Sequence, residues 1–204
     1  MNPKDTDLHG NVPDTSPVAL LIIDMINDLE FPGGDELAEP ARVAAEHIAV
    51  LKRRAKALGI PVIYVNDNFG RWRSDFKEAV DHVRNDGVRG EFLASILSPE
   101  SDDYVVLKPK HSSFYVTTLD TLLVYLQTKH LILTGMTTDS CILFTANDAY
   151  MRDFNISIPS DCVAAIKPTY TNDALAYMKR LLGADVTPSS QLDLATLCQD
   201  VSLV

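Results

Sequence analysis

The chain has 204 residues, which is long enough for one domain with a sizeable core. Hydrophobic residues make up 46% of it and charged residues 23%, an ordinary composition for a globular protein. The formal charge of −10 argues against nucleic acid or an anionic membrane as the main partner, although a local pocket can still be positive.

Residues 1–16 are polar and are predicted to form a tail ahead of a single domain at 17–204. The tail has no apolar stretch of the signal-peptide type, and no window reaches the roughly 18 apolar residues of a membrane span. These features predict a cytoplasmic protein without a membrane partner. The cysteines Cys141, Cys162 and Cys198 are widely spaced and form no CxxC or Cys/His cluster, so neither a disulfide framework nor a zinc site is expected.

From residue 17 onward, near-continuous apolar runs alternate with segments of helical period. The expected strands are residues 17–24, 60–67, 103–110, 130–136 and 155–161, with a short sixth strand in 184–189. The expected helices are residues 43–58, 74–85, 119–129, 139–153 and 171–182. A loop is expected at 31–40, and residues 68–101 are expected to be polar and irregular outside their one helix.

Two of these helices have clear boundary signals. Val43, Ile48 and Leu51 belong to an apolar series with steps of three and four residues, and Gly59 is expected to end that helix. Asp139 is the expected N-cap of the helix that follows the fourth strand.

Strands that are apolar at nearly every residue are typical of a parallel sheet with both faces covered. Their alternation with helices predicts an α/β fold, a Rossmann-like parallel β-sheet with helices on both faces. Because no linker divides the chain and no internal repeat is found, one domain is expected.

In such sheets, ligands bind outside the carboxyl ends of the strands, near the point where strand order reverses. The polar residues at these ends are Asp24 after the first strand, Asn66 and Asp67 in the second, Lys108 in the third, and the Thr137–Cys141 turn after the fourth. An acid, a base and a thiol would thus converge from separate strands, and this combination is more specific than any one of them.

A free cysteine is usually a small core residue, and Cys141 could be no more than that. With Asp139 as N-cap, however, Cys141 falls in the first helical turn, where unpaired N–H groups and the helix dipole stabilise a thiolate or an oxyanion. Asp24 is either a turn cap or a general base. Lys108 is either a solvated strand end or the charge that keeps the acid and the thiol ionised. The two other cysteines have no such partners and are expected to be structural.

The chain contains three distinctive stretches: "LLIIDMINDLEFPGG", "VLKPKHSSFYVTTLDTLL" and "LILTGMTTDSCILFTANDAYMRDFNISIPSDCVA". They resemble the three signature blocks of the isochorismatase-like cysteine hydrolases and follow the order of that family. The resemblance covers the chain from Pro17 to Ala165, and three ordered blocks are a stronger signal than any single one.

This resemblance implies a catalytic triad of Asp24, Lys108 and Cys141. It also implies a cis peptide bond between Met136 and Thr137, with the backbone N–H groups of Thr137 and Cys141 forming an oxyanion hole. In the implied mechanism, the carboxylate takes the thiol proton, the thiolate attacks a carbonyl, and water then hydrolyses a thioester. No cofactor is needed, the partner is a small-molecule substrate, and the family suggests a homo-oligomer, either a dimer or a tetramer.

Two features favour one branch of the family. True isochorismatases carry a residue other than cysteine at the Cys141 position, because vinyl-ether hydrolysis needs an acid and no nucleophile, so the thiol favours cleavage of a C–N bond. Nicotinamidases bind a metal through a D-x-H motif after the second strand, whereas in "NDNFGRWRSDF" Asp67 is followed by Phe69 in place of the histidine. No metal site is therefore expected, and nicotinamide is disfavoured as the substrate.

The candidate substrate contacts are Phe31, Asn66, Arg71 and Trp72. The "FGRWR" segment around Trp72 is either a lid whose arginine meets a substrate carboxylate or a solvated loop with one packed aromatic residue. Small amides, ureido acids, carbamoyl amino acids and maleamate-like compounds all suit the triad. His111 is assigned no role.

Three other functions stay open. The chain could hydrolyse a non-amide substrate in the manner of an isochorismatase. It could be a non-catalytic module that binds small molecules, although an intact Asp/Lys/Cys set argues against this. It could also sense redox state through Cys141, which would need a resolving cysteine, and Cys162 after the fifth strand is the candidate.

Overall fold

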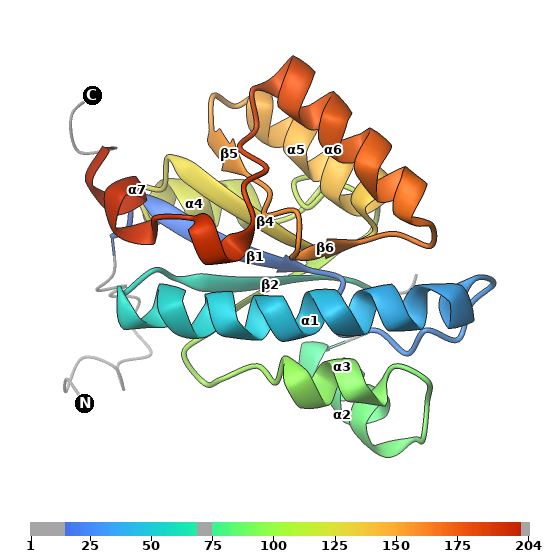
Figure 1. Cartoon of the computed structure of the whole chain (residues 1–204). Helices are drawn as coiled ribbons and strands as arrows, with labels where there is room; N and C mark the ends of the chain where they lie inside the picture. The colour runs from blue at the N-terminus through green and yellow to red at the C-terminus, as the bar shows by residue number, and fades with distance from the viewer. Residues whose placement is uncertain (1–14, 69–74, 201–204) are drawn as a thin grey trace.

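A six-stranded parallel sheet runs through the computed structural model, which describes residues 15–68 and 75–200 (Figure 1). Its strands are β1 (Val18–Ile23), β2 (Val62–Asp67), β3 (Tyr104–Lys108), β4 (His130–Met136), β5 (Asn155–Ser157) and β6 (Val163–Ala164). The order across the sheet is β3-β2-β1-β4-β5, and the short β6 pairs with the carboxyl end of β4.

The helices are α1 (Gly34–Ala57), α2 (Phe76–Asn85), α3 (Glu91–Ile96), α4 (Leu119–Tyr125), α5 (Leu143–Tyr150), α6 (Pro168–Leu182) and α7 (Leu194–Asp200). A single π-helical turn, Thr138–Ile142, precedes α5, and a 3-10 turn, Ser189–Gln191, precedes α7.

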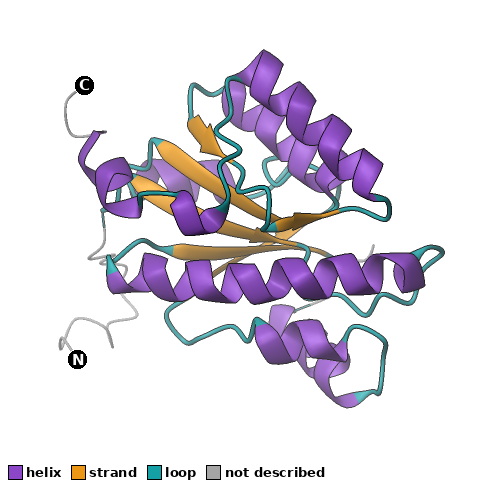
Figure 2. Ribbon diagram, in the orientation of Figure 1, coloured by secondary structure: helices purple, strands orange, loops and turns teal. Residues whose placement is uncertain are grey.

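Successive side chains of β1 point to opposite faces of the sheet, and both faces are covered. Leu20 and Ile22 pack in a core with α1, α2, α3 and α7. Leu21 and Ile23 pack in a second core with α4, α5 and α6. Helices therefore lie on both sides of the sheet (Figure 2), and the predicted fold class is confirmed.

Strand order reverses between β1 and β4. The chain runs outward from β1 to β2 and β3, and it then returns to the other side of β1 as β4. At such a reversal, a crevice opens at the carboxyl ends of the two central strands. Asp24 follows β1 and Thr137 follows β4, so both candidate residues stand at this crevice.

Helix α1 begins at Gly34, well before residue 43, so the loop predicted at 31–40 is wrong over most of its length. Leu37 and Ala41 are fully buried and extend the apolar series of this helix toward its N-terminus. Their packing outweighs the cost of Pro40, which lacks an N–H and normally interrupts a helix.

The turn that carries Cys141 also differs from the prediction. Thr137 is the N-cap of the helical stretch and makes no side-chain capping bond, so the predicted capping role of Asp139 is wrong. Asp139 instead lies inside the π-helical turn, a rare conformation that an N-cap pattern does not distinguish from an α-helix.

Two short helices, α3 and α7, and the short strand β6 were not predicted. The sixth strand expected at 184–189 is reduced to one isolated bridge between Ser157 and Asp185. Each of these elements is too short to show a reliable period of hydrophobicity.

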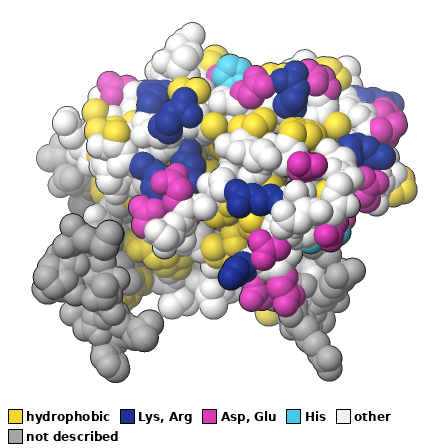
Figure 3. Space-filling model, turned by 90° about the horizontal axis from the view of Figure 1, so that it is seen from below, with side chains coloured by type: hydrophobic (Ala, Val, Ile, Leu, Met, Phe, Trp, Pro, Cys, Tyr) yellow, Lys and Arg dark blue, Asp and Glu magenta, His cyan; other side chains and the backbone are white. Residues whose placement is uncertain are grey.

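The surface carries charges of both signs. On the face seen in Figure 3, acidic and basic side chains are interspersed, and neither sign forms a continuous patch. In the part of the chain that the structure describes, no helix combines the length and apolar character needed to cross a membrane.

Candidate active site

Asp24 lies directly after β1 with a φ of +56° and is only 6% exposed. Its backbone N–H donates to the carbonyl of Val65 at 2.9 Å, which extends the pairing of β1 with β2 by one residue. Its carboxylate accepts a hydrogen bond from the backbone N–H of Asp67 at 2.8 Å. The end of β2 therefore fixes both the backbone and the carboxylate of this residue.

Lys108 is the last residue of β3, and its side chain is fully buried. The ammonium Nζ lies 2.8 Å from Asp24 Oδ2 and 3.5 Å from the sulfur of Cys141. It also lies 3.8 Å from Asp67 Oδ2, since Asp67 and Lys108 are register partners on adjacent strands. An acid, an ammonium and a thiol thus converge at the carboxyl ends of the strands, as the sequence predicted.

Cys141 enters the site through the connection from β4 to the π-helical turn. Gly135 has a φ of +116°, and a Cβ on it would lie 2.0 Å from the carbonyl oxygen of Ile23, so only glycine fits there. The peptide bond between Met136 and Thr137 is cis, as predicted.

Burial dominates the electrostatics of the acid and the thiol. It raises the pKa of Asp24 above the ordinary value, although the charge of Lys108 opposes this. Burial and the neighbouring Asp24 raise the pKa of the Cys141 thiol to about 12, again against Lys108. Burial lowers the pKa of Lys108, but the adjacent anionic groups outweigh it, and the pKa is raised overall. The charge of Lys108 thus favours the thiolate, while burial and the Asp24 carboxylate oppose it.

A pocket of about 400 Å³ opens over this cluster. Its lining consists of Asp24, Asn27, Phe31, Leu37, Asp67, His111, Met136, Thr137, Ser140 and Cys141. The acid, the thiol and both predicted oxyanion residues therefore share one small cavity with Phe31. Arg71 and Trp72 lie outside the described residues.

Asn66 does not reach this pocket, and its predicted contact with substrate is wrong. The side chain is fully buried, its Oδ1 accepts from the N–H of Ile26 at 3.2 Å, and its Nδ2 donates to the carbonyl of Ile26 at 2.8 Å. Both polar groups are thus used to hold the loop after β1. Alternation along β2 turns Asn66 to the opposite face from Asp67.

Sequence reasoning missed several lining residues, among them Asn27, Leu37, His111 and Ser140. His111 is exposed and packs against Phe144 with ring centroids 5.5 Å apart. For Asn27, His111 and Ser140 the available signal was position, because each follows a strand end by a few residues, but loop direction cannot be read from a pattern. Leu37 gave no such signal, because it lies inside α1.

The described residues offer no ready metal site. Among residues 15–68 and 75–200, no group of three or more His, Cys, Asp or Glu side chains is placed to hold an ion. Phe69, which stands in place of the histidine of the D-x-H motif, lies outside the described residues.

The chain is similar to known proteins over most of its length. The family model of the isochorismatase domain matches residues 18–191. YaaI, an uncharacterized isochorismatase family protein of Bacillus subtilis, is 42% identical over 174 residues, which are 85% of this chain and 95% of that protein. The isochorismatase of the same organism is 31% identical over 200 residues, 94% of this chain and 63% of that protein. The solved N-carbamoylsarcosine amidase of Thermoplasma acidophilum is 28% identical, with a TM-score of 0.65 over 86% of this chain and 98% of that one.

Proposed function

The chain belongs to the isochorismatase family of hydrolases, and on that premise we propose that it is a cysteine-dependent hydrolase of a C–N bond. Its substrate is a small amide, carbamoyl or ureido compound. The observation that carries this proposal is that the carboxylate of Asp24 and the sulfur of Cys141 both lie within 3.5 Å of the Lys108 ammonium. The acid and the thiol also line one pocket of about 400 Å³.

In the proposed first step, the carboxylate of Asp24 accepts the proton of the Cys141 thiol, and the thiolate attacks the substrate carbonyl carbon. The charge of Lys108 stays within reach of both groups, so the negative charge is compensated before and after the transfer. The backbone N–H groups of Thr137 and Cys141 donate to the oxyanion of the tetrahedral intermediate.

In the second step, the C–N bond breaks, and Asp24 returns its proton to the departing nitrogen. An amine or ammonia leaves, and the acyl group remains on sulfur as a thioester. Asp24 then takes a proton from water, whose oxygen attacks the thioester. The acid is released, and the proton returns to the sulfur.

The thiol and the pocket support an amide substrate. A pocket of this volume suits a small molecule, and attack by sulfur requires an electrophilic carbon with a leaving group. The similarity to an N-carbamoylsarcosine amidase supports carbamoyl and ureido compounds as the first class to test.

A second candidate is hydrolysis of a non-amide substrate, favoured by the 31% identity to an isochorismatase. Such a reaction needs the acid and not the thiol. A redox role is less supported, because Cys162 is fully buried in the core on the α1 face, whereas Cys141 packs against the core on the opposite face.

The test is ammonia release from a panel of small amides and ureido acids by the wild type and by Cys141→Ala, with and without a metal chelator. We expect release by the wild type alone, unaffected by chelator. Activity that survives in Cys141→Ala would exclude the thioester route and favour the second candidate. Activity lost with chelator would show that a metal takes part.

We also propose a homo-oligomer, a dimer or a tetramer, in the cytoplasm. Large apolar side chains at the surface support association, since Val116, Val124 and Met151 are 73%, 72% and 69% exposed. Light scattering of the purified chain tests this, and a monomer over the working concentration range would contradict it.

A further inference from the structure

The segment 27–31 forms one wall of the pocket, since Asn27 and Phe31 line it together with Cys141. It belongs to no helix or strand. Leu29 in its middle is fully buried and has a φ of +58°, a left-handed conformation that L residues rarely adopt. Contacts from outside the segment are therefore needed to hold this wall.

Those contacts come from the turn that precedes α3. Nη1 of Arg89 donates to the carbonyl of Leu29 at 2.5 Å, and the backbone N–H of Arg89 donates to Oε1 of Glu30 at 2.9 Å. The N–H of Gly90 donates to the carbonyl of Asp28 at 2.9 Å.

The backbone of Gly90 packs directly against the carbonyl group of Asn27. A Cβ on Gly90 would lie 1.8 Å from the carbonyl oxygen of Asn27, so a side chain there would push Asn27 away. Together, Arg89 and Gly90 contact the segment at each residue from 27 to 30.

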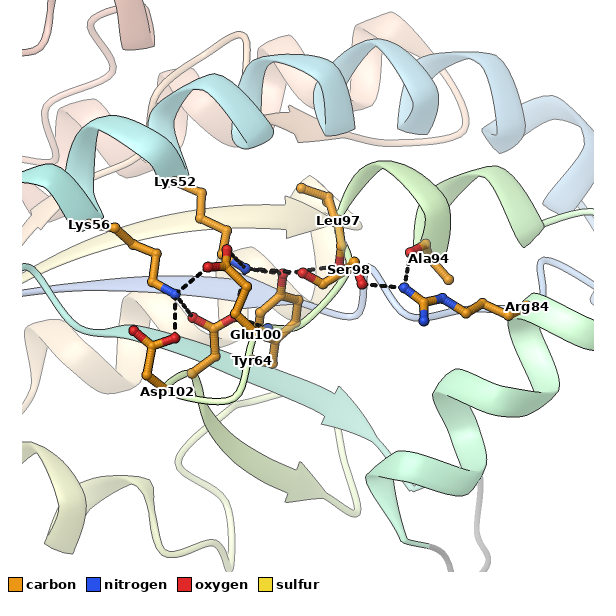
Figure 4. Close-up of polar contacts among 10 residues, drawn as sticks. Lys52, Lys56, Tyr64, Arg84, Ala94, Leu97, Ser98, Glu100 and Asp102 are labelled. Carbon is orange, nitrogen blue, oxygen red and sulfur yellow. Dashed lines mark hydrogen bonds and ion pairs between the residues drawn. The ribbon is translucent and has the colours of Figure 1, made fainter. Parts of the chain in front are cut away.

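The far end of α3 is fixed as well (Figure 4). The hydroxyl of Tyr64 donates to the carbonyl of Leu97 at 3.0 Å, and Nζ of Lys52 donates to the carbonyl of Ser98 at 3.2 Å. Arg84 on α2 donates to the hydroxyl of Ser98. Because α1, α2 and β2 all hold this end, α3 is a fixed support for the turn at its other end.

We propose that Arg89 is a positioning residue for substrate binding: its guanidinium, bound to the carbonyl of Leu29, holds Asn27 and Phe31 in place as the pocket wall. The triad is held separately, because Lys108 and the N–H of Asp67 fix the carboxylate of Asp24. Loss of Arg89 therefore weakens substrate binding and leaves the reactivity of the thiol intact. This inference rests on the proposed hydrolase function.

The test compares Arg89→Ala with Arg89→Lys, Glu30→Gln and the control Arg42→Ala. Arg42 is a fair control because its side chain is 41% exposed, against 38% for Arg89, and its ion pairs among the described residues are with Glu39 and Glu46 on α1. We expect Arg89→Ala to raise KM roughly 10-fold to 100-fold with kcat within about twofold of wild type. Arg89→Lys recovers part of this, since one ammonium still reaches the carbonyl but lacks the planar fork.

Glu30→Gln separates the two contacts that Arg89 makes. This variant removes the ion pair between the side chains of Arg89 and Glu30, which is long, 3.6 Å, and exposed. It keeps a side-chain oxygen that accepts from the backbone N–H of Arg89. We therefore expect KM close to wild type in this variant. An unchanged KM in a folded Arg89→Ala variant, or a parallel fall of kcat and melting temperature, would overturn the proposal.

A second readout needs no turnover. Cys141 is labelled with iodoacetamides of increasing N-alkyl size, and the modified peptide is quantified by mass spectrometry. We expect the wild type to reject the larger reagents, and Arg89→Ala to accept them while it reacts with iodoacetamide itself at the wild-type rate. If the wild type hydrolyses no amide, the proposed function fails, and this size selectivity alone decides the role of Arg89. Equal selectivity in both proteins would overturn it.

Discussion

Lys108 compensates one negative charge in the site at a time. Burial raises the pKa of Asp24, and burial together with Asp24 raises the pKa of Cys141 to about 12. The ammonium lies 2.8 Å from the carboxylate and 3.5 Å from the sulfur, so it can stabilise either anion but not both fully. The proposed reaction therefore moves one negative charge from carboxylate to sulfur and back as the proton moves.

This arrangement makes a prediction for Asp24→Asn. The variant should lose hydrolysis, because no base takes the thiol proton and no acid protonates the leaving nitrogen. Alkylation of Cys141 by iodoacetamide should become faster at about pH 8, because removal of the carboxylate charge lowers the thiol pKa and leaves Lys108 to stabilise the thiolate. The measurement is the rate of Cys141 labelling against pH, with ammonia release measured in parallel.

Asp67→Asn is the matched control for this prediction. Asp67 lies 3.8 Å from Lys108, but the main causes of the shift of the thiol pKa are burial, Asp24 and Lys108, so the Asp67 variant should label at close to the wild-type rate. Slower labelling in Asp24→Asn than in the wild type would mean that Asp24 already holds the proton in the resting site.

Lys108 also bears on stability, because its ammonium is fully buried beside a nearly buried carboxylate. Lys108→Met leaves the charge of Asp24 unpaired, and breaking such a pair costs about 3–5 kcal/mol of unfolding free energy. The loss should shrink as the pH falls, because Asp24, whose pKa is already raised, then takes up a proton. Urea unfolding across pH measures both effects.

The double variant Asp24→Asn with Lys108→Met serves as the control. It contains neither charge, so it should be more stable than Lys108→Met alone. Equal stability of the two variants would show that the loss comes from packing of the lysine stem and not from the unpaired carboxylate.

At the scale of elements, β1 to β4 could be predicted because each is a largely continuous apolar run. The candidate site residues at three strand ends followed from the same pattern, since a parallel sheet brings the carboxyl ends together. The early start of α1 could not be predicted, because Pro40 signals a loop while the burial of Leu37 depends on tertiary packing. The π-helical turn was missed because an N-cap pattern does not distinguish it from an α-helix. Alternation along β2 puts Asn66 and Asp67 on opposite faces without saying which of the two faces the site.

The carboxyl end of β4 supports a prediction for Gly135→Ala. The added Cβ would lie 2.0 Å from the carbonyl oxygen of Ile23, and both atoms belong to paired strands that cannot easily move apart. We expect a loss of unfolding free energy above the about 1–2 kcal/mol of a positive φ alone. We also expect a loss of activity, because Ile23 precedes Asp24 and Gly135 leads into the turn of Cys141.

Gly183→Ala isolates the backbone part of this cost. Gly183 has a φ of +66° at the end of α6, and a Cβ there meets no atom within 4 Å. The measurements are the unfolding free energy and the rate of substrate turnover of both variants. If Gly135→Ala is no less stable than Gly183→Ala, the close approach to β1 has little energetic weight.

At the scale of the whole molecule, the excess of acidic residues is partly compensated by local clusters. Nζ of Lys56 lies 2.6 Å from Oδ1 of Asp102, and 3.0 Å from both Oε2 of Glu100 and Oδ1 of Asp103. This cluster joins the end of α1 to the segment before β3, across the interface between helix layer and sheet. The formal charge of −10 gave no indication of it.

The ion pairs of Lys56 contribute to the pH dependence of the unfolding free energy. The pKa values of Glu100 and Asp102 are lowered, in both cases mainly by the hydrogen bond from Lys56. A carboxyl group of lowered pKa adds stability above its ordinary pKa, 4.5 for Glu100 and 3.8 for Asp102, and this is lost as the pH falls through the folded value. Asp24, with a raised pKa, acts in the opposite direction.

Lys56→Met should therefore lower the unfolding free energy near neutral pH, and this difference should vanish as both carboxyl groups become protonated. The effect should be about 1 kcal/mol, because the side chains of Glu100 and Asp102 are 58% and 71% exposed and the buried Asp103 keeps Lys52 as a partner at 2.6 Å. Lys179→Met is the control, since Lys179 also lies in the last turn of a long helix and has no ion pair within the described residues. The cluster explanation fails if the difference in urea midpoint between wild type and Lys56→Met stays constant into the acid range and Lys179→Met shows the same difference. The loss of stability would then come from removing a positive charge at the end of a helix.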